Sequence, residues 1–296
     1  MSSNRERNDR KSGKKPPRKP ASEGPRGRAS GPGQAWSPAV QASGGAAPRG
    51  ARGRLDPDQV LWGRHPVLAA LANPARQGRG RLFATPDRAE ELARDGLLQG
   101  REVERIEARD LDRMLPPGAV HQGLAFKVAP LEGVALEALA EPAEGVIVML
   151  DQLTDPQNVG AIFRSALAFG ARGVIVQDRH SPALAGALAK AAAGATERLP
   201  CARVVNLSRA LEALADLGWR AVGLDGGAEA TLDEALDARP TVLVMGSEGE
   251  GLRRLVAEHC DALARIPMPG GFESLNVSNA AAVALYEASR KQGERP

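Results

Sequence analysis

The chain has 296 residues, of which 43% are hydrophobic, 3% are aromatic and 25% are charged. This length accommodates two ordinary domains and a tail, while the low aromatic content argues against a platform on which RNA bases stack. Cys201 and Cys260 are too far apart to suggest a disulfide framework or a zinc motif. We find no apolar run of membrane-spanning length and no apolar secretory signal, so we expect a soluble cytoplasmic protein that does not bind membranes.

The formal net charge of +3 is divided unevenly along the chain. Residues 1–54 carry 13 Lys and Arg against 3 Asp and Glu, whereas the remainder carries 26 against 33. Because this N-terminal stretch is also rich in Pro, Gly and Ser, it cannot bury enough apolar surface to offset its ordering entropy. We predict a disordered basic tail over residues 1–55, which either attracts RNA phosphates or only keeps the protein soluble.

Short helix and strand patterns alternate over residues 58–130, which is typical of a small α/β domain. Helices are expected from Pro66 onward, at 89–98 and at 108–115, and strands at 81–85, 103–108 and 124–128. Residues 131–144, rich in Ala, Glu and Pro, are expected to form a linker with a possible helical turn.

Apolar runs and helical patterns alternate again over residues 145–293, which predicts a parallel sheet covered on both faces. Strands are expected at 145–150, 173–177, 200–205, 219–224, 241–246 and 264–268. Helices are expected at 159–169, 184–195, 208–217, 252–259 and 274–291. Ligands of such sheets bind beyond the carboxyl ends of the strands, so the loops there are the candidate site.

Three of these loops carry glycines and short polar side chains. The first contains Asn158 at the start of a helix from which Arg164 projects away from the apolar face. The second, 246–251, has its glycines spaced GxxGxG with Glu248 between them, which is neither a dinucleotide-binding fingerprint nor a P-loop. The third, 266–279, is a Pro/Gly turn followed by polar residues that either cap a helix or face a ligand. A composite site formed by the three loops is favoured over three unrelated turns.

Together the three loops closely resemble the motifs of the SpoU (TrmH) family of RNA ribose 2′-O-methyltransferases. The matching residues are Asp155-Pro156-Gln157-Asn158-Val159-Gly160 through Arg164, then Met245-Gly246-Ser247-Glu248-Gly249, then Ile266-Pro267-Met268 with Ser274-Leu275-Asn276-Val277-Ser278. The segment from Leu61 to Val128 resembles the RNA-binding domain of the family, which is similar to the ribosomal protein L30e fold. The arrangement looks most like the branch that methylates guanosine in 23S ribosomal RNA.

The resemblance implies an α/β fold in which residues 145–293 form a trefoil-knotted (SPOUT) methyltransferase domain, an exception to the rule against knots. It also implies a homodimer with active sites near the subunit interface, and S-adenosyl-L-methionine as the methyl donor without a metal. The residues implied to bind the donor are Met245, Gly246, Ile266, Met268 and Leu275. Those implied to act in catalysis are Arg164, Asn158, Glu248, Ser274 and Asn276.

The ribose hydroxyl must be positioned and must lose its proton. The resemblance makes Arg164 the candidate for activating it. A guanidinium with a pKa above about 12 is a poor general base, so we favour phosphate binding and oxyanion stabilisation for Arg164, with Glu248 as the alternative proton acceptor. Two alternatives to the 23S assignment stay open, a transfer RNA methyltransferase of the same family and a catalytically inactive RNA-binding homologue. A dehydrogenase is disfavoured because the GxGxxG fingerprint is missing.

Overall fold

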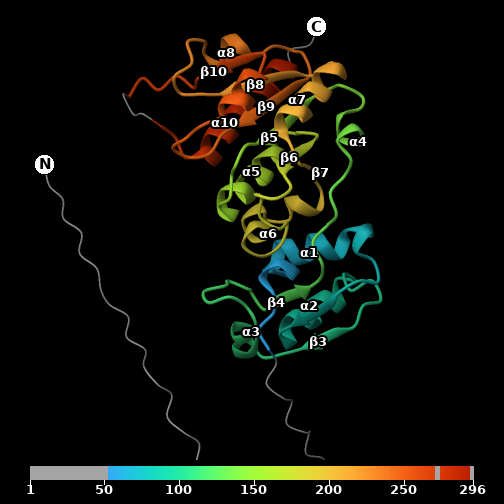
Figure 1. Cartoon of the computed structure of the whole chain (residues 1–296). Coiled ribbons are helices and arrows are strands. Elements are labelled where there is room, and N and C mark those ends of the chain that lie inside the picture. The colour runs from blue at the N-terminus through green and yellow to red at the C-terminus, as the bar shows by residue number, and fades with distance from the viewer. Residues whose placement is uncertain (1–52, 271–273, 294–296) are drawn as a thin grey trace, which may run out of the picture. The chain divides into compact units, whose positions relative to one another are not determined.

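The computed structural model describes residues 53–270 and 274–293, which belong to one compact unit. The basic tail predicted for residues 1–55 therefore lies almost entirely outside the described residues, as does the centre of the Pro/Gly turn at 271–273. The described residues form one sheet of four strands and one of six (Figure 1). None of their helices is long and apolar enough to cross a membrane.

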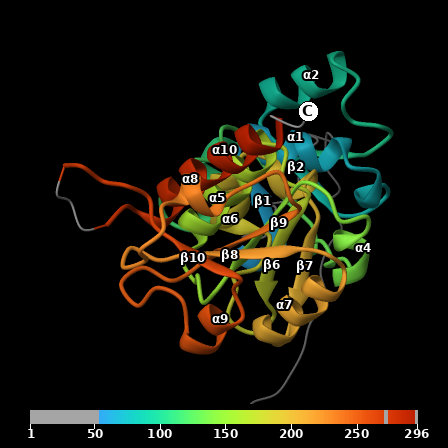
Figure 2. The ribbon, with the colours of Figure 1, turned by 90° about the horizontal axis from the view of Figure 1, so that it is seen from above.

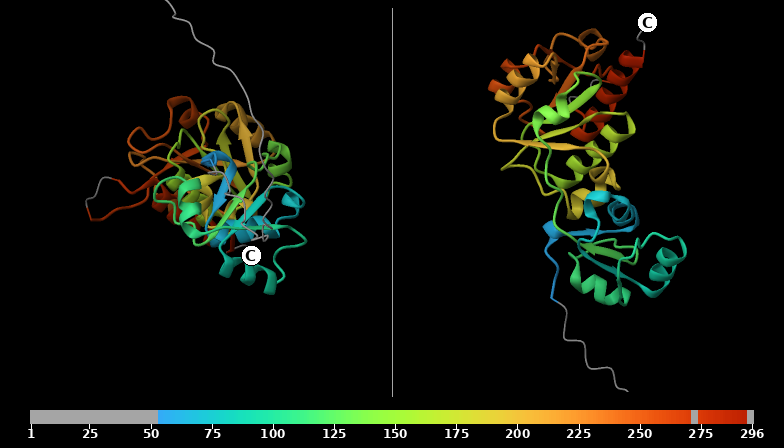
Figure 3. Two further views of the ribbon diagram at one scale, coloured as in Figure 1. Left: turned by 90° about the horizontal axis from the view of Figure 1, so that it is seen from below. Right: turned by 90° about the vertical axis from the view of Figure 1, so that its right-hand side faces the viewer.

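The small sheet has the strand order β1-β4-β2-β3, with β4 antiparallel to both of its neighbours and β2 parallel to β3. Its strands are β1 (Val60–Trp62), β2 (Arg81–Ala84), β3 (Val103–Arg105) and β4 (Leu124–Lys127). The helices beside it are α1 (Arg64–Ala72), α2 (Pro86–Arg94) and α3 (Ala108–Met114), coloured blue to green in Figure 3. Alternate strand residues face opposite cores: Leu82 packs with α1 and α2, whereas Phe83 packs with α3.

The large sheet is parallel throughout and has the order β10-β8-β9-β5-β6-β7. Its strands are β5 (Val146–Leu150), β6 (Gly173–Gln177), β7 (Cys201–Val204), β8 (Arg220–Leu224), β9 (Thr241–Met245) and β10 (Ala262–Ala264). Its helices are α4 (Leu136–Ala140), α5 (Pro156–Ala168), α6 (Gly186–Ala192), α7 (Leu207–Asp216), α8 (Leu232–Ala235), α9 (Arg254–Glu258) and α10 (Val277–Gly293). The expected parallel α/β architecture is confirmed.

Both faces of the large sheet are covered, as expected from its continuous apolar strands. Figure 2 shows α5, α6, α8 and α10 on one face and α7 and α9 on the other. In β5 the side chains of Val146 and Val148 enter the first core, and those of Ile147 and Met149 enter the second. This two-sided burial fixes the register of the central strands, so the loops at their carboxyl ends start from defined positions.

Some predicted boundaries are wrong. The strand expected at 264–268 occupies Ala262–Ala264, because its partner β8 ends at Leu224 and the prolines that follow lack backbone donors. The first helix begins at Arg64 rather than at Pro66, and the preceding strand β1 was not predicted. Helix α8 was also missed, although Thr231 and Glu234 form a capping box at its start.

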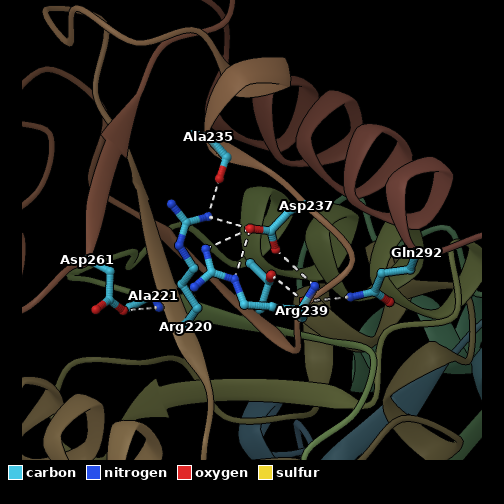
Figure 4. Close-up of polar contacts among 8 residues, drawn as sticks. Arg220, Ala221, Ala235, Asp237, Arg239, Asp261 and Gln292 are labelled. Carbon is cyan, nitrogen blue, oxygen red and sulfur yellow. Dashed lines mark hydrogen bonds and ion pairs between the residues drawn. The ribbon is translucent and has the colours of Figure 1, made fainter. Parts of the chain in front are cut away.

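Gln292, near the C-terminal end of α10, points toward Arg239 in the loop that precedes β9 (Figure 4). The side-chain amide of Gln292 donates to the carbonyl oxygen of Gly145 at 2.8 Å, and the carboxylate of Asp237 pairs with Arg239 at 2.7 Å. Arg220 donates to the carbonyl oxygen of Ala235. The contact of Gln292 ties the end of α10 to the residue before β5, and that of Arg220 ties β8 to the end of α8.

A buried ion pair joins the segment after α1 to the 3-10 helix Ala195–Glu197. The guanidinium of Arg76 contacts both carboxylate oxygens of Glu197, at 2.7 and 3.0 Å, and the two side chains are only 3% and 1% exposed. Asn73 donates to the same carboxylate at 2.9 Å. Three donors therefore balance a charge that is almost completely removed from water.

Candidate functional site

A cavity of about 780 Å³ opens at the carboxyl ends of β8, β9 and β10. Its lining comes from four segments: 224–227 after β8, 245–251 after β9, 264–268 after β10, and 274–280 at the start of α10. Two of the three predicted loops, those at 246–251 and 266–279, contribute directly. The location agrees with the rule that parallel sheets bind ligands beyond the carboxyl ends of their strands.

All five residues predicted to bind a methyl donor line this cavity: Met245, Gly246, Ile266, Met268 and Leu275. Met245 is 2% exposed and belongs to the core of the sheet as well, whereas Leu275 is 40% exposed. The structure therefore brings the five residues together around one cavity. Their role in binding the donor stays a prediction.

Gly246 is required by the close approach of two backbone segments. A Cβ atom at this position would lie 2.1 Å from the carbonyl carbon of Gly251. The chain doubles back here through paired backbone hydrogen bonds of 3.0 Å between Ser247 and Gly251, with Gly249 and Gly251 at positive φ. The spacing of the glycines thus builds a tight loop that presents Glu248 at its tip.

Glu248 is the centre of a hydrogen-bond cluster that joins all three predicted loops. Its Oε1 accepts hydrogen bonds from the side-chain amides of Asn158 at 3.1 Å and Asn276 at 2.8 Å, and from the backbone N–H of Val277 at 3.3 Å. Asn276 also donates to Oδ1 of Asn158 at 3.0 Å. Asn158 lies 90 residues before Glu248 in the sequence, and Asn276 lies 28 residues after it. The fold therefore brings three of the predicted catalytic residues into direct contact.

Asn276 caps a helix, one of the two functions that the sequence left open, and it also contacts the other loops; a contact with a ligand stays a prediction. Its Oδ1 accepts hydrogen bonds from the backbone N–H groups of Ser278 at 3.0 Å and Asn279 at 3.4 Å, which caps α10. Its Nδ2 points to the other loops, where it contacts Glu248 and Asn158. The cap holds the amide in one orientation, so the same side chain fixes the helix start and the polar cluster.

The other two predicted catalytic residues stand apart from this cluster. Arg164 is exposed on α5 and does not line the cavity, and its side chain makes no hydrogen bond or ion pair with any described residue. Ser274 lines the cavity and is exposed, without a side-chain hydrogen bond to the described part of the chain. The predicted direction of Arg164, away from the apolar face of its helix, is confirmed.

Sequence reasoning missed Asp151, which directly follows β5. Its side chain is completely buried, and its two oxygens accept hydrogen bonds from the backbone N–H of Arg253 at 2.9 Å and from the guanidinium of that residue at 2.7 Å. Arg253 follows the glycine loop, so this contact ties the first loop to the second. A charged residue immediately after a fully apolar strand was the signal that could have found it.

We expect Asp151→Asn to lower the stability of the protein by roughly 2 kcal/mol, because the amide places N–H groups against the donors of Arg253. The glycine loop loses its tie to β5, so affinity for the methyl donor should fall as well. Thermal melting and calorimetric titration measure the two effects. Asp178→Asn is the matched control, since Asp178 follows β6 in the same way but is exposed. Equal melting temperatures for the two variants would contradict the role given to Asp151.

The cysteines take no part in the cavity. Burial raises the pKa of the Cys201 thiol to about 11 and that of Cys260 to about 12, so both stay protonated at neutral pH. Both pack against the sheet, as expected for small core residues. Across residues 53–270 and 274–293 we find no group of three or more His, Cys, Asp or Glu residues arranged to hold a metal ion.

Comparisons with known protein families give two matches. Residues 145–286 match the SpoU rRNA methylase family, and residues 60–134 match the family of RNA 2′-O ribose methyltransferase substrate-binding domains. A protein of Mycolicibacterium smegmatis described as an uncharacterized tRNA/rRNA methyltransferase is 41% identical over 247 residues, covering 81% of this chain and 78% of the relative.

Solved structures agree with the sequence comparison. The SpoU methyltransferase AviRb from Streptomyces viridochromogenes, in complex with AdoMet, superposes with a TM-score of 0.65 at 28% identity over 80% of this chain and 91% of that one. An AdoMet-bound rRNA methyltransferase from Sinorhizobium meliloti gives 0.63 at 26% identity, covering 78% and 86% of the two chains. With family matches over both sheets and a relative at 41% identity, this chain belongs to the SpoU family of RNA methyltransferases.

Proposed function

We propose that the protein transfers a methyl group from S-adenosyl-L-methionine to the ribose 2′-hydroxyl of a guanosine in 23S ribosomal RNA. The observation that carries the proposal is the contact of Asn158, Glu248 and Asn276 at one side of the cavity that holds all five predicted donor-binding residues. Membership in the SpoU family supports the reaction class, and the AdoMet-bound relatives support the donor.

The cavity suits S-adenosyl-L-methionine in size and chemistry. A volume of about 780 Å³ is within the range of small-molecule sites, and apolar side chains alternate with exposed glycine backbone along its walls. Met245, Ile266 and Met268 would hold the adenine between apolar surfaces, and the loop around Gly246 would offer main-chain groups. When bound, the donor supplies an electrophilic sulfonium methyl group, so the chain itself needs to orient and deprotonate the attacking hydroxyl.

Glu248 is the proposed proton acceptor. Three hydrogen bonds hold its Oε1, whereas no hydrogen bond from a described residue reaches Oε2. Asn158 and Asn276 thereby orient the carboxylate and leave one oxygen for the ribose hydroxyl. Arg164, a permanently charged guanidinium that pairs with no described residue, would bind an RNA phosphate and stabilise charge on the attacking oxygen. Ser274 would orient the ribose from the cavity wall.

The RNA would be recognised outside the methyl-donor cavity. We assign residues 58–130 as the RNA-binding domain and 145–293 as the methyltransferase domain, joined by the linker 131–144. The match of residues 60–134 to substrate-binding domains supports this division. We further propose a homodimer in which Arg164 reaches an active site near the interface, which would account for an arginine whose side chain has no partner among residues 53–270 and 274–293. Transfer RNA is the second candidate substrate, since the relatives are described as tRNA/rRNA methyltransferases.

The test is to map 2′-O-methyl groups in total RNA from strains with and without the gene, and to repeat the transfer with purified protein and labelled donor. We expect one guanosine of 23S ribosomal RNA to lose its methyl group on deletion and to regain it in vitro. A missing transfer RNA methyl group instead would establish the second candidate. Binding of RNA without any methyl transfer would establish an inactive homologue and overturn the proposal.

A further inference from the structure

The cavity has a fourth wall that none of the three family motifs supplies. It is formed by residues 224–227, which follow β8 and read Leu-Asp-Gly-Gly. Asp225 is the charged side chain of this wall, and it is exposed where the wall meets the cavity. A carboxylate at this place can accept hydrogen bonds from donor groups of a ligand in the cavity.

Asp225 is held in one conformation by its own loop. Its Oδ1 accepts a hydrogen bond from the backbone N–H of Gly227 at 2.8 Å, while its own backbone N–H donates to the carbonyl oxygen of Ala264 at 3.0 Å. Among the described residues no hydrogen bond or ion pair reaches Oδ2. The carboxylate is thus oriented through one oxygen and has the other available, together with the second lone pair of Oδ1.

The position of Asp225 separates it from the reacting cluster. Strand β8 is divided from β5 by β9 in the sheet, and Asn158 lies in the helix that follows β5. Asp225 instead adjoins the end of β10, where Leu224 pairs with Ala264 and the chain continues to Ile266 and Met268. These apolar residues form the wall proposed for the adenine, so the carboxylate lies beside the nucleoside half of a bound donor.

A nucleoside offers two vicinal hydroxyl groups next to its base, and both are hydrogen-bond donors. A carboxylate at the end of a parallel strand accepts ribose hydroxyls in dinucleotide-binding folds for the same chemical reason. The next two residues are glycines: a Cβ on Gly226 would meet no atom within 4 Å, and Gly227 avoids the contact of 3.4 Å that a Cβ would make with Oδ1 of Asp225. We propose that Asp225 binds the ribose 2′- and 3′-hydroxyls of the methyl donor and thereby determines the affinity for its nucleoside.

This inference rests on the proposed function. Titration of donor analogues without RNA distinguishes a failure of the role of Asp225 from a failure of the proposed function. Wild-type protein is titrated calorimetrically with S-adenosylhomocysteine, its 2′,3′-dideoxy analogue and 5′-methylthioadenosine. Asp225→Asn is titrated with the same three ligands. Asparagine still accepts the hydrogen bond from Gly227, so the loop should keep its conformation and the melting temperature should not change.

We expect Asp225→Asn to weaken binding of S-adenosylhomocysteine and of 5′-methylthioadenosine by roughly 10-fold to 100-fold, because both carry the diol. Binding of the dideoxy analogue should change by less than about twofold between wild type and variant. Glu229→Gln is the matched control, since Glu229 is an exposed carboxylate in the same segment after β8 that does not line the cavity, and it should leave all three affinities unchanged.

Two results would overturn the assignment. If the variant lost affinity for S-adenosylhomocysteine but not for 5′-methylthioadenosine, which lacks the amino acid, Asp225 would pair with the ammonium group of the donor. If it lost affinity for the dideoxy analogue equally, the carboxylate would not bind the diol. A wild-type protein that bound none of the three ligands would instead refute the proposed function.

Discussion

Arg164→Ala is expected to lower methyl transfer by about a thousandfold or more, while the affinity for the methyl donor stays within about twofold. The physical reason is the location of the side chain. Arg164 projects from α5 into solvent, outside the donor cavity and outside the Asn158–Glu248–Asn276 cluster. Removing it should therefore leave the donor site intact and eliminate only the charge that we propose binds an RNA phosphate and stabilises the attacking oxygen.

Single-turnover transfer of labelled methyl groups measures the first effect, and calorimetric titration without RNA measures the second. Arg164→Lys should recover part of the activity, because lysine keeps the charge but lacks the planar fork that grips a phosphate through two bonds. Arg254→Ala is the control, since Arg254 is exposed on α9 and forms a surface ion pair with Glu258. Activity of Arg164→Ala within a few-fold of wild type would remove this residue from the mechanism.

Arg76→Ala is expected to cost roughly 3–5 kcal/mol of stability, because it leaves the carboxylate of Glu197 buried with only Asn73 as a side-chain donor. For a chain of this size the loss corresponds to a fall in melting temperature of about 10 °C. Replacing Arg76 and Glu197 together by methionines should recover most of the loss, since an apolar pair leaves no charge to solvate.

Thermal melting of the single and double variants tests this expectation. Arg254→Ala again provides the comparison, because its ion pair with Glu258 has the same 2.7 Å separation but side chains that are 78% and 51% exposed. An exposed pair of this kind contributes at most about 1 kcal/mol. If both single variants melted at the same temperature, the buried pair would be no more important than a surface one.

The sequence by itself determined the features that depend on local pattern. The apolar run Val146–Leu150 predicted a strand buried on both faces, and it is one. The apolar periodicity from Val159 predicted both the helix and the outward direction of Arg164, because side-chain direction in a helix follows from rotation alone. The polar residues around Asn276 indicated a helix cap as one of two alternatives, and the cap could be read locally because it satisfies donors only two or three residues away.

The tertiary structure decided which distant residues meet. Asn158 contacts Glu248 across 90 residues and Asp151 contacts Arg253 across 102, because the sheet places β5 directly beside β9. Asp225 faces the same cavity because β8 is the neighbour of both β9 and β10. No local pattern encodes this strand order, since it follows from packing two hydrophobic cores at once. The three motifs were therefore visible in the sequence, and the fourth wall of the cavity was not.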